Sequence, residues 1–446
     1  MAFRRSSNHQ MDQKRIIAID GHNLALQRGT GVATYAKNLA ENVRELGWDA
    51  WTLYGAPISA KQPPMLREIS FYDYLGGTSQ KRGWMTSTYL EAKQLVQAPF
   101  GYRAVEIPQS GVVEIRRFST RLPSGTKIFN INDLFLVARR HFKRHRKFLT
   151  IRFDERPDIM HWTYPLPVRA EGVPNVYTIH DLVPLRLPYT TLDNKRYYHR
   201  LIKGCIDFGD HVCTVSEKSK EDIINIFGAD CDCITNTYQS VETSRAMGSR
   251  NVSEVEQEVE GIYGLKPYDY FLFFGAIEPK KNVGRLIEAY LSAKVDAKLV
   301  IVGALAWKSS EEMKLFESMA KVHSAMHENI KVFDYAPRSF LMSLIRCAKA
   351  VVFPSLYEGF GLPLLEAMQL GVPTLCSSEG SLPEIAGDAS VVVDPYDVTS
   401  IARGMEKLDS DERLRERLVE VGFDQAAKFD AATYRKRLQG MYAALV

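Results

Sequence analysis

The sequence predicts an α/β protein of two Rossmann-like domains that face each other across a cleft. Two observations predict this fold class. The chain has 446 residues, more than a single hydrophobic core usually organises, so two domains are the natural expectation. Short apolar runs of strand length also alternate with helical apolar patterns in both halves, which is typical of parallel sheets with crossover helices.

The first domain is expected to open with a strand, a glycine loop and a helix. An apolar run covers 15–20, a Gly-Thr-Gly turn follows at 29–31, and apolar residues then recur at helical spacing over 32–46. This order is typical of the first unit of a doubly wound sheet. Further strands of this domain are expected at 159–162, 176–180 and 211–215.

A second series of strands begins after the middle of the chain. Between 57 and 150 the pattern is poor, so irregular insertions over the first domain are expected there. The later apolar runs are separated by helical stretches, as in a βα repeat. They lie at 270–274, 298–302, 330–333, 350–353, 374–376 and 391–393.

These patterns set the expected domain boundaries. Residues 1–12 are polar and lack an apolar core segment, so they are interpreted as a disordered tail and not as a signal peptide. The remaining boundaries follow from the two strand series. They are 13–245 for the N-terminal domain, 246–263 for a linker, 264–425 for the C-terminal domain and 426–446 for a last helix that crosses back to the first domain.

Composition excludes several classes of function. A formal net charge of +4 is too small to indicate a nucleic-acid partner. No apolar run reaches the roughly 18 residues of a membrane-spanning helix. The six cysteines form no CxxC pair, so reduced thiols in the cytoplasm are the simplest interpretation.

The most informative segment is EGFGLPLLE at 358–366, directly after the apolar run 350–353. Its glycines and proline predict a strand, a glycine loop and a helix. Glu358 would lie on the loop and Glu366 about one turn into the helix, with the helix N-terminus facing the same crevice. Backbone N–H groups suit phosphate, and carboxylates suit sugar and ribose hydroxyls, so the segment favours a sugar nucleotide.

Several other segments accompany this one. They read FGAIEPKKN at 274–282, TIHDL at 178–182, TVSEKS at 214–219, LPE at 382–384, GDA at 387–389, and Asp20 with TGVATY at 30–35. Together with the E-x7-E spacing, they resemble the motifs of retaining glycosyltransferases of family 4, which have the GT-B fold. The resemblance covers most of 15–56 and 158–410 and is weak across 57–150.

The resemblance implies roles for the residues of the 358–366 segment. Glu358 would contact the hydroxyls of the transferred sugar and orient it, and Glu366 would accept hydrogen bonds from the ribose. The backbone amides of Phe360, Gly361 and Leu362 would hold sugar hydroxyls and phosphate. The alternative is a pair of solvent-facing glutamates at a helix start, where the helix dipole favours them.

The leaving diphosphate of a transferase without a metal needs cations. Lys281 is the residue that the resemblance assigns to it. Many family members carry an arginine five residues earlier, where this chain has Ala276, or directly before the lysine, where it has Lys280. Either Lys280 or Arg285 would then supply the second cation.

Two more positions are candidates by resemblance. His180 ends an apolar strand and would lie beside the anomeric region of the donor sugar; a structural histidine is the alternative. Gly31 would belong to a glycine loop near the donor phosphates or the acceptor; an ordinary tight turn is the alternative. Asp230-Cys-Asp232 matches a DxD metal motif but lacks a strand-end context, so it is interpreted as a surface loop.

Taken together, the resemblance implies a retaining glycosyltransferase that requires no metal or other cofactor. Its C-terminal domain would bind a nucleotide sugar, with GDP-mannose favoured, and its N-terminal domain a glycan or lipid-linked acceptor in surface polysaccharide or lipopolysaccharide biosynthesis. The alternatives are a degenerate GT-B scaffold subunit that partners an active transferase, or a GT-B phosphorylase or epimerase. The expected location is the cytoplasm.

A basic segment could add peripheral contact with the inner face of the membrane. The stretch 139–147 carries six Arg or Lys residues in nine positions. It is interpreted either as a solvated helix face or as a surface that contacts anionic lipid or a phosphate-bearing acceptor.

Overall fold

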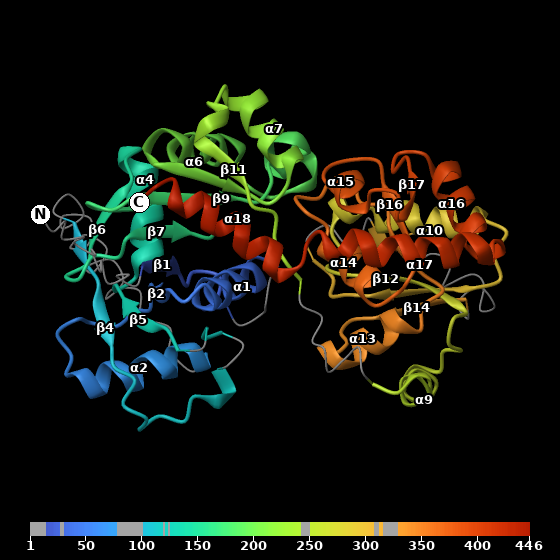
Figure 1. Cartoon of the computed structure of the whole chain (residues 1–446), viewed down its shortest axis with the longest axis horizontal. Helices are drawn as coiled ribbons and strands as arrows, with labels where there is room; N and C mark the ends of the chain where they lie inside the picture. Colours follow the sequence, from blue (N-terminus) through green and yellow to red (C-terminus); the bar gives the residue numbers. More distant parts are fainter. Residues whose placement is uncertain are drawn as a thin grey trace, which may run out of the picture. The chain divides into compact units, whose positions relative to one another are not determined.

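A computed structural model gives the fold of the chain, shown in Figure 1. The residues that it describes are 15–26, 31–77, 101–118, 121–123, 125–241, 250–306, 312–314 and 329–446. The predicted tail at 1–12 and the first two residues of the predicted glycine turn at 29–31 lie outside these residues.

By their contacts, the residues group into two compact units. The first unit consists of Met1–Thr178, Arg200–Cys213 and Leu438–Val446, and the second of Ile179–His199 and Thr214–Arg437. The segments 179–199 and 214–241, which the sequence pattern placed in the N-terminal domain, thus pack with the second unit. The predicted domain boundaries remain a prediction.

An eight-stranded sheet is the framework of the N-terminal half, with the order β11-β10-β9-β7-β1-β2-β5-β4 among the described residues. The four predicted strands of this half are confirmed as β1, β7, β9 and β10. The strands are β1 (Ile16–Asp20), β2 (Asp49–Tyr54), β4 (Val105–Ile107), β5 (Lys127–Asn130), β7 (Ile159–Trp162), β9 (Asn175–Ile179), β10 (His211–Thr214) and β11 (Ile234–Asn236).

Parallel pairing places the carboxyl ends of the central strands at one edge of this sheet. β1 pairs in parallel with β2 and β7, β2 with β5, and β7 with β9, whereas β4 runs antiparallel to β5. β7 and β9 are buried along their whole length, as expected for parallel strands that are covered on both faces. The accompanying helices are α1 (Gly31–Glu45), α2 (Pro64–Gly76), α4 (Leu134–His145), α5 (Val183–Arg186), α6 (Lys195–Phe208) and α7 (Glu217–Phe227).

The region 57–150 contains more regular structure than the sequence pattern indicated. β5 is an integral strand of the large sheet, and α2 and α4 flank it in the chain. A separate three-stranded sheet has the order β3-β6-β8, from β3 (Tyr102–Arg103), β6 (Leu149–Arg152) and β8 (Val168–Ala170). The expectation of irregular insertions was therefore incomplete, because strands of two to four residues are too short to show a period of two.

The second sheet has the order β14-β13-β12-β15-β16-β17, and each of its printed pairings is parallel. All six strands lie where the sequence predicted them. They are β12 (Tyr270–Phe274), β13 (Lys298–Val302), β14 (Ile330–Phe333), β15 (Ala350–Phe353), β16 (Thr374–Ser377) and β17 (Ser390–Val393). Three of the central strands, β12, β15 and β16, are buried along their whole length.

Helices flank the second sheet. Figure 1 shows α10 beside α16 and α14 beside α17, in agreement with their contacts. They include α10 (Val283–Ser292), α13 (Arg338–Arg346), α14 (Leu362–Gln369), α15 (Leu382–Ala386), α16 (Val398–Ser410) and α17 (Glu412–Ala427). Short 3-10 turns occur at η2 (Arg116–Phe118), η3 (Pro188–Thr190), η4 (Cys231–Cys233) and η5 (Pro279–Lys281).

The described part of the predicted linker 246–263 contains a helix. Residues Val252–Tyr263 form helix α9, which packs against α13. Val255 and Val259 lie one turn apart and are buried in the core cluster of the second sheet. The segment looked like a linker because its remaining positions are mostly polar, as they are on the solvent-facing side of an amphipathic helix.

The last helix, α18 (Ala431–Ala443), carries the chain end into the first unit, to which Leu438–Val446 belong. There the Tyr442 hydroxyl lies 2.5 Å from Nδ1 of the fully buried His161, whose Nε2 lies 2.7 Å from the Thr178 hydroxyl. Both ring nitrogens of His161 are thereby satisfied, as a buried imidazole requires.

Two further features concern the cysteines and the length of the helices. The cysteines are all free, and four of the six are buried, namely Cys205, Cys213, Cys347 and Cys376. Within the described part of the chain, none of the helices has both the length and the apolar character needed to cross a membrane.

Candidate active site

The segment 358–366 has the predicted form of a strand, a glycine loop and a helix. β15 ends at Phe353 and α14 begins at Leu362, with Gly361 at its N-cap. Gly361 has a φ of 112°, and a Cβ there would meet the Leu382 side chain at 2.7 Å. Glycine is therefore required at this turn. The turn places the N-terminus of α14 at the end of the loop.

The segment Gly380–Ser381 packs against the backbone of the glycine loop. The buried Ser381 hydroxyl shares its single hydrogen between the carbonyl oxygens of Glu358, at 3.0 Å, and Phe360, at 2.8 Å. The neighbouring Gly380 has a φ of 67°, and a Cβ on it would lie 2.8 Å from the Glu358 nitrogen. These contacts fix the backbone on both sides of the Glu358 side chain.

The loop also packs against the segment around His180, within the same unit. A Cβ on Gly359 would lie 2.5 Å from the carbonyl oxygen of His180, so the two backbones touch. The same carbonyl accepts a hydrogen bond from the Ser219 hydroxyl at 2.8 Å. Ser219 belongs to the predicted VSxxS turn, in which Ser216 caps helix α7. The backbone of His180 thus contacts the glycine loop, and its predicted place beside the donor sugar stays a prediction.

The residue before Glu358 anchors the loop from another side. Tyr357 packs with Leu356, Val183 and Leu187 in a small apolar cluster. Its hydroxyl donates to the carboxylate of the buried Asp222 on α7. The Tyr357 side chain is therefore held in one position, which restricts the backbone of the loop that follows it.

The two lysines follow β12 on the 3-10 turn η5 (Pro279–Lys281). Asn282 ends this turn in the left-handed conformation, with a φ of 62°. Its buried amide donates to the carbonyl oxygens of Pro354, at 2.9 Å, and Pro395, at 2.7 Å. Asn282 therefore ties the lysine turn to the end of β15, from which the Glu358 loop starts.

Lys281 and Glu358 form an ion pair with 2.5 Å between Nζ and Oε1. The Lys281 ammonium also lies 4.8 Å from the centre of the Phe353 ring. Burial alone would raise the pKa of the Glu358 carboxyl, but Lys281 and then Lys280 outweigh burial, so this pKa is lowered. Glu358 is therefore ionised at neutral pH although only 7% of it is exposed.

Lys280 lies among carboxylates, with 3.8 Å from its Nζ to both Glu278 and Glu358. Burial lowers the pKa of its ammonium, but the charges of Glu358, Asp181 and Glu278 more than offset this effect and raise the pKa. The pKa of Glu278 is raised, mainly by burial. Two cations thus converge on one buried carboxylate.

Arg285 points elsewhere. Its guanidinium donates to the side-chain oxygen of Asn282 at 3.0 Å and lies 5.8 Å from the centre of the Tyr396 ring. Of the two residues that the sequence left open as the second cation, Lys280 is the one with its charge at the Glu358 carboxylate.

Glu366 lies inside α14, where 8% of it is exposed. Its Oε1 accepts a hydrogen bond from the guanidinium of Arg338 at 2.7 Å. The Arg338 side chain is itself 57% exposed, so the pair lies at the surface of the site and not in the core. A ligand hydroxyl at Glu366 would share this carboxylate with Arg338 or displace it.

The other residues that the sequence singled out lie in different parts of the fold. Phe360 is buried and packs edge to face against Phe429 at 5.7 Å. Leu362 is the first residue of α14. Gly31 is the first residue of α1 and belongs to the other unit. Asp230 caps the 3-10 turn η4 by accepting from the Asp232 nitrogen, which gives the DxD sequence a local structural role.

Sequence reasoning missed three residues that shape the site. Ser381 and Gly380 precede the LPE segment that the sequence singled out, and Arg338 follows a proline at the start of α13. A serine next to a glycine is a common turn, and an arginine in a first helical turn is usually solvated. No local signal therefore distinguished them.

Comparison with known proteins identifies the family. A model of the family described as "Glycosyl transferases group 1" matches residues 256–425, and a model described as "Glycosyltransferase Family 4" matches 109–245. An O-antigen chain mannosyltransferase B of Escherichia coli is 33% identical over 272 residues, which cover 59% of this chain and 68% of the relative. The chain belongs to these glycosyltransferases. The resemblance inferred from the E-x7-E segment is confirmed.

Other relatives are larger or more distant. A serotype-specific mannosyltransferase WbdA of Escherichia coli is 30% identical over 277 residues, which cover 60% of this chain and 34% of the relative. The chain therefore spans about a third of the length of that glycosyltransferase.

Solved structures confirm the GT-B fold. Anabaena Alr3699/HepE, solved in complex with UDP and glucose, has a TM-score of 0.65 at 14% identity, and the match covers 97% of this chain and 100% of that one. WaaG, a glycosyltransferase involved in lipopolysaccharide biosynthesis, has a TM-score of 0.59 at 14% identity, with 96% and 99% covered.

The contacts behind the loop generate the first prediction. We expect Gly380→Ala to lower the melting temperature and weaken nucleoside diphosphate binding. The left-handed φ costs an alanine about 1–2 kcal/mol, and the new Cβ would press on the Glu358 backbone. Thermal unfolding and calorimetry measure both effects.

The matched control is Gly261→Ala in α9, where a Cβ would have no heavy atom within 4 Å. Alanine is favoured over glycine in a helix by roughly 0.5–1 kcal/mol, so this variant should be at least as stable as the wild type. Identical melting temperatures and affinities for the two variants would contradict the role given to Gly380.

Proposed function

We propose that this glycosyltransferase transfers mannose from GDP-mannose to a glycan or lipid-linked acceptor, with retention of the anomeric configuration. The observation that carries the proposal is the convergence of Lys280 and Lys281 on the buried Glu358, beside the N-terminus of α14. Two cations and a helix N-terminus suit a diphosphate, and a buried ionised carboxylate suits the hydroxyls of a sugar.

The lysines would act on the leaving group. Cleavage of the bond between the sugar and the diphosphate leaves an additional negative charge on the diphosphate oxygen. Lys280 and Lys281 would stabilise this charge in a partly buried site, where electrostatic interactions are stronger than in water. Their ion pairs with Glu358 hold both ammonium groups in place before the donor binds.

The carboxylates would position the donor. Glu358 would accept hydrogen bonds from the hydroxyls of the transferred sugar, and Glu366 from the ribose. Retention without an evident carboxylate nucleophile then implies attack on the same face from which the diphosphate leaves, through an oxocarbenium-like transition state. The backbone of His180, in contact with Gly359, would border the anomeric region.

Mannose is favoured by the relatives. Both proteins with at least 30% identity that are described above are mannosyltransferases, and one is named for the O-antigen chain. We infer a role in surface polysaccharide synthesis from the same relatives.

Two assays test the function. A thermal-shift screen against GDP, UDP, dTDP and ADP identifies the base, because a ligand that binds only the folded state raises its stability. Release of GDP from GDP-mannose, with and without acceptor glycans, then tests chemistry. A chain that binds no nucleotide and releases none would instead be the degenerate scaffold subunit.

The two carboxylates should respond differently to truncation. We expect Glu358→Ala to reduce turnover more than nucleotide affinity, and Glu366→Ala to weaken nucleotide binding. Loss of one hydrogen bond to a charged group costs on the order of 1.5–3 kcal/mol. Calorimetry with GDP and initial-rate kinetics on both variants provide the measurement; equal losses of affinity would refute the assignment.

The second cation can be assigned by a matched pair of variants. Lys280→Met should weaken GDP binding about ten- to a hundredfold, as expected for a lost charged hydrogen bond. Arg285→Met should leave the affinity nearly unchanged, because its guanidinium contacts Asn282 and Tyr396. The reverse ranking would assign the diphosphate to Arg285.

Transfer should not require a divalent metal, because the two lysines supply positive charge where the diphosphate would bind. We expect the rate of transfer in excess EDTA to equal the rate in buffer alone. Abolition of activity by EDTA and its recovery on addition of manganese would show that a metal is needed.

We further propose that the basic segment 139–147 docks on anionic lipid. It lies at the end of α4, and its side chains Arg139, Lys143, Arg144, Arg146 and Lys147 are exposed. Val137 and Phe142 bury the opposite face of the helix. The charges are thus available to a surface, and each contributes roughly 1 kcal/mol near anionic lipid, screened by salt.

Liposome co-sedimentation tests this docking. The wild type should partition onto vesicles with phosphatidylserine at low salt, and a variant with Arg140, Lys143, Arg144 and Lys147 changed to Gln should stay in solution. High salt should release the wild type. Equal partition of the two proteins, or no binding by either, would make the segment a solvated helix face.

A further inference from the structure

The buried carboxylate of Glu278 has no part in the reaction as proposed above. Glu278 follows β12 and begins the turn η5, which carries both lysines. Among the described residues, its side chain accepts no capping hydrogen bond from this turn, and only 7% of the residue is exposed. Its carboxylate lies 3.8 Å from Nζ of Lys280. A buried carboxylate that no structural role explains, in a site built for charge, is a candidate for a functional one.

The backbone on both sides of Glu278 is fixed. The Ile277 nitrogen donates to the Ala304 carbonyl oxygen at 3.0 Å. On the other side, the Lys280 carbonyl oxygen accepts a hydrogen bond from the Leu356 nitrogen at 2.8 Å. The Glu278 carboxylate is therefore held beside the lysines, and a change in the charges around it acts on its proton affinity.

Four charged groups act on the Glu278 carboxylate. Lys280 and Lys281 from its own turn attract it, whereas Glu358 from the loop after β15 and Asp181 from the segment after β9 repel it. All of them belong to the second unit. Burial has the largest effect and raises the pKa of Glu278, whereas the lysines lower the pKa of Glu358. Of these two carboxylates, Glu278 is the one that accepts a proton more readily.

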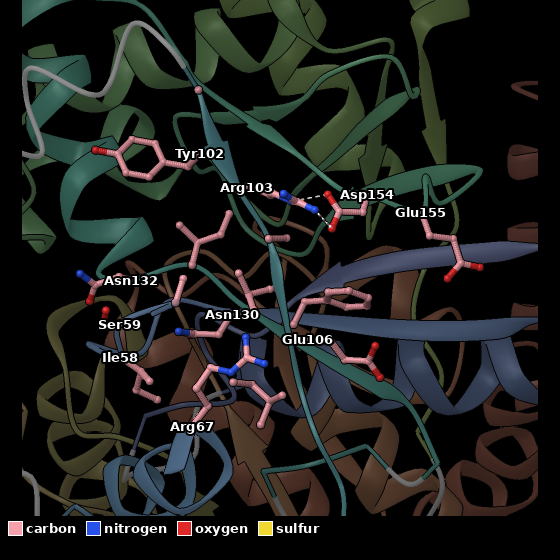
Figure 2. A pocket seen from close by; sticks show the side chains of 17 residues that line it. Ile58, Ser59, Arg67, Tyr102, Arg103, Glu106, Asn130, Asn132, Asp154 and Glu155 are labelled. Atoms are coloured by element: carbon pink, nitrogen blue, oxygen red, sulfur yellow. Dashed lines mark hydrogen bonds and ion pairs between the residues drawn. The ribbon is translucent and has the colours of Figure 1, made fainter. Parts of the chain in front are cut away.

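The carboxylates around a pocket in the first unit show the opposite arrangement. Figure 2 shows Asp154 beside Arg103, with dashed lines for their interaction. Glu155, which also lines this pocket of about 880 Å³, lies 3.2 Å from Nζ of Lys127. The side chains of both pairs are exposed. Each of these carboxylates has a cation of its own and water around it, so ligand binding elsewhere should not change its protonation.

A bound diphosphate would change the balance of charge around Glu278. Its oxygens would draw the two lysines toward the ligand and would themselves repel the Glu278 carboxylate. Both effects favour the neutral acid over the ionised form. A neutral Glu278 no longer competes for Lys280, so the charge of that ammonium would be directed at the diphosphate.

We propose that Glu278 is a positioning residue that takes up one proton from solvent when the donor diphosphate binds, and returns it when the nucleoside diphosphate leaves. The proton bonds to a carboxylate oxygen of Glu278, and no other bond forms or breaks. The ionised form holds Lys280 in place before the donor binds, and the protonated form releases Lys280 to the ligand. This role rests on the proposed function, because it requires the lysines to bind the diphosphate.

Calorimetry with GDP in buffers of different ionisation enthalpy counts the protons that binding takes up. The full chain is measured as wild type, Glu278→Gln and Asp154→Asn, over roughly pH 6 to 8. Glutamine has the shape of protonated Glu278 but does not titrate, and the comparison between proteins cancels the titration of GDP itself. Asp154→Asn is the matched control, because it removes an exposed, ion-paired carboxylate of the first unit. Melting temperatures verify folding.

We expect GDP binding to take up protons equally in the wild type and Asp154→Asn, and to take up fewer in Glu278→Gln. A group whose pKa is higher in the complex favours binding below its pKa in the free protein, and this gain is lost as the pH rises through its pKa in the complex. The affinity of the wild type should therefore rise as the pH falls, more steeply than that of Glu278→Gln by up to about tenfold per pH unit. At the high end of the range, Glu278→Gln should bind GDP more tightly than the wild type.

Three results would overturn the proposal. They are the absence of proton uptake by the wild type, equal uptake by all three proteins, and a loss of affinity in Glu278→Gln that is the same at every pH. The last of these is the result expected of a carboxylate with a structural role alone.

The same titrations with inorganic pyrophosphate separate this role from the proposed function. If pyrophosphate binds with uptake that depends on Glu278 while GDP does not bind, the proton linkage stands and the proposed function fails. If GDP binds without that uptake and is released from GDP-mannose, the reaction stands and the role of Glu278 fails. If neither ligand binds, both fail.

Discussion

The ion pair between Lys281 and Glu358 is the interaction on which the candidate active site depends. It joins the turn after β12 to the loop after β15, two neighbouring strands of the second sheet. A partly buried pair of this kind contributes little net stability, because desolvation of both charges offsets their attraction. Loss of one partner, however, would leave an uncompensated buried charge. The surrounding structure must therefore hold both residues in register, and Asn282, Ser381 and Gly380 do so through backbone contacts.

In the proposed function, this arrangement would let one site bind a diphosphate and a sugar. The charges of the lysines lower the pKa of Glu358 and so favour its ionised form, and Glu358 holds both lysines by ion pairs. A bound diphosphate would take over part of the interaction of Lys280 and Lys281 with Glu358, so the two lysines would need to move little. The N-terminus of α14, with the positive end of its dipole, lies at the same loop, because Gly361 turns the backbone into the helix there.

The two units differ in how much of their structure is common to the family. The second unit contains the E-x7-E loop and the lysine turn, and the group 1 family model covers most of it. The residues of the first unit before 109 lie outside both family matches, because the family 4 model begins at 109.

The sequence by itself determined the strands of the second sheet, because parallel strands buried on both faces are continuous apolar runs that stand out from their surroundings. It also determined the E-x7-E loop, since Gly361 and the proline after it leave few backbone choices. Only the tertiary structure decided which side chains contact the site residues. These contacts join segments that lie far apart in the chain. They are the hydrogen bond from Arg338 to Glu366, the hydrogen bond from Ser381 to the Glu358 carbonyl, and the approach of Lys280, and not Arg285, to Glu358. It also decided that 252–263 is a packed helix and that β5 is a sheet strand, because what a short or half-polar segment becomes depends on the surface it is packed against.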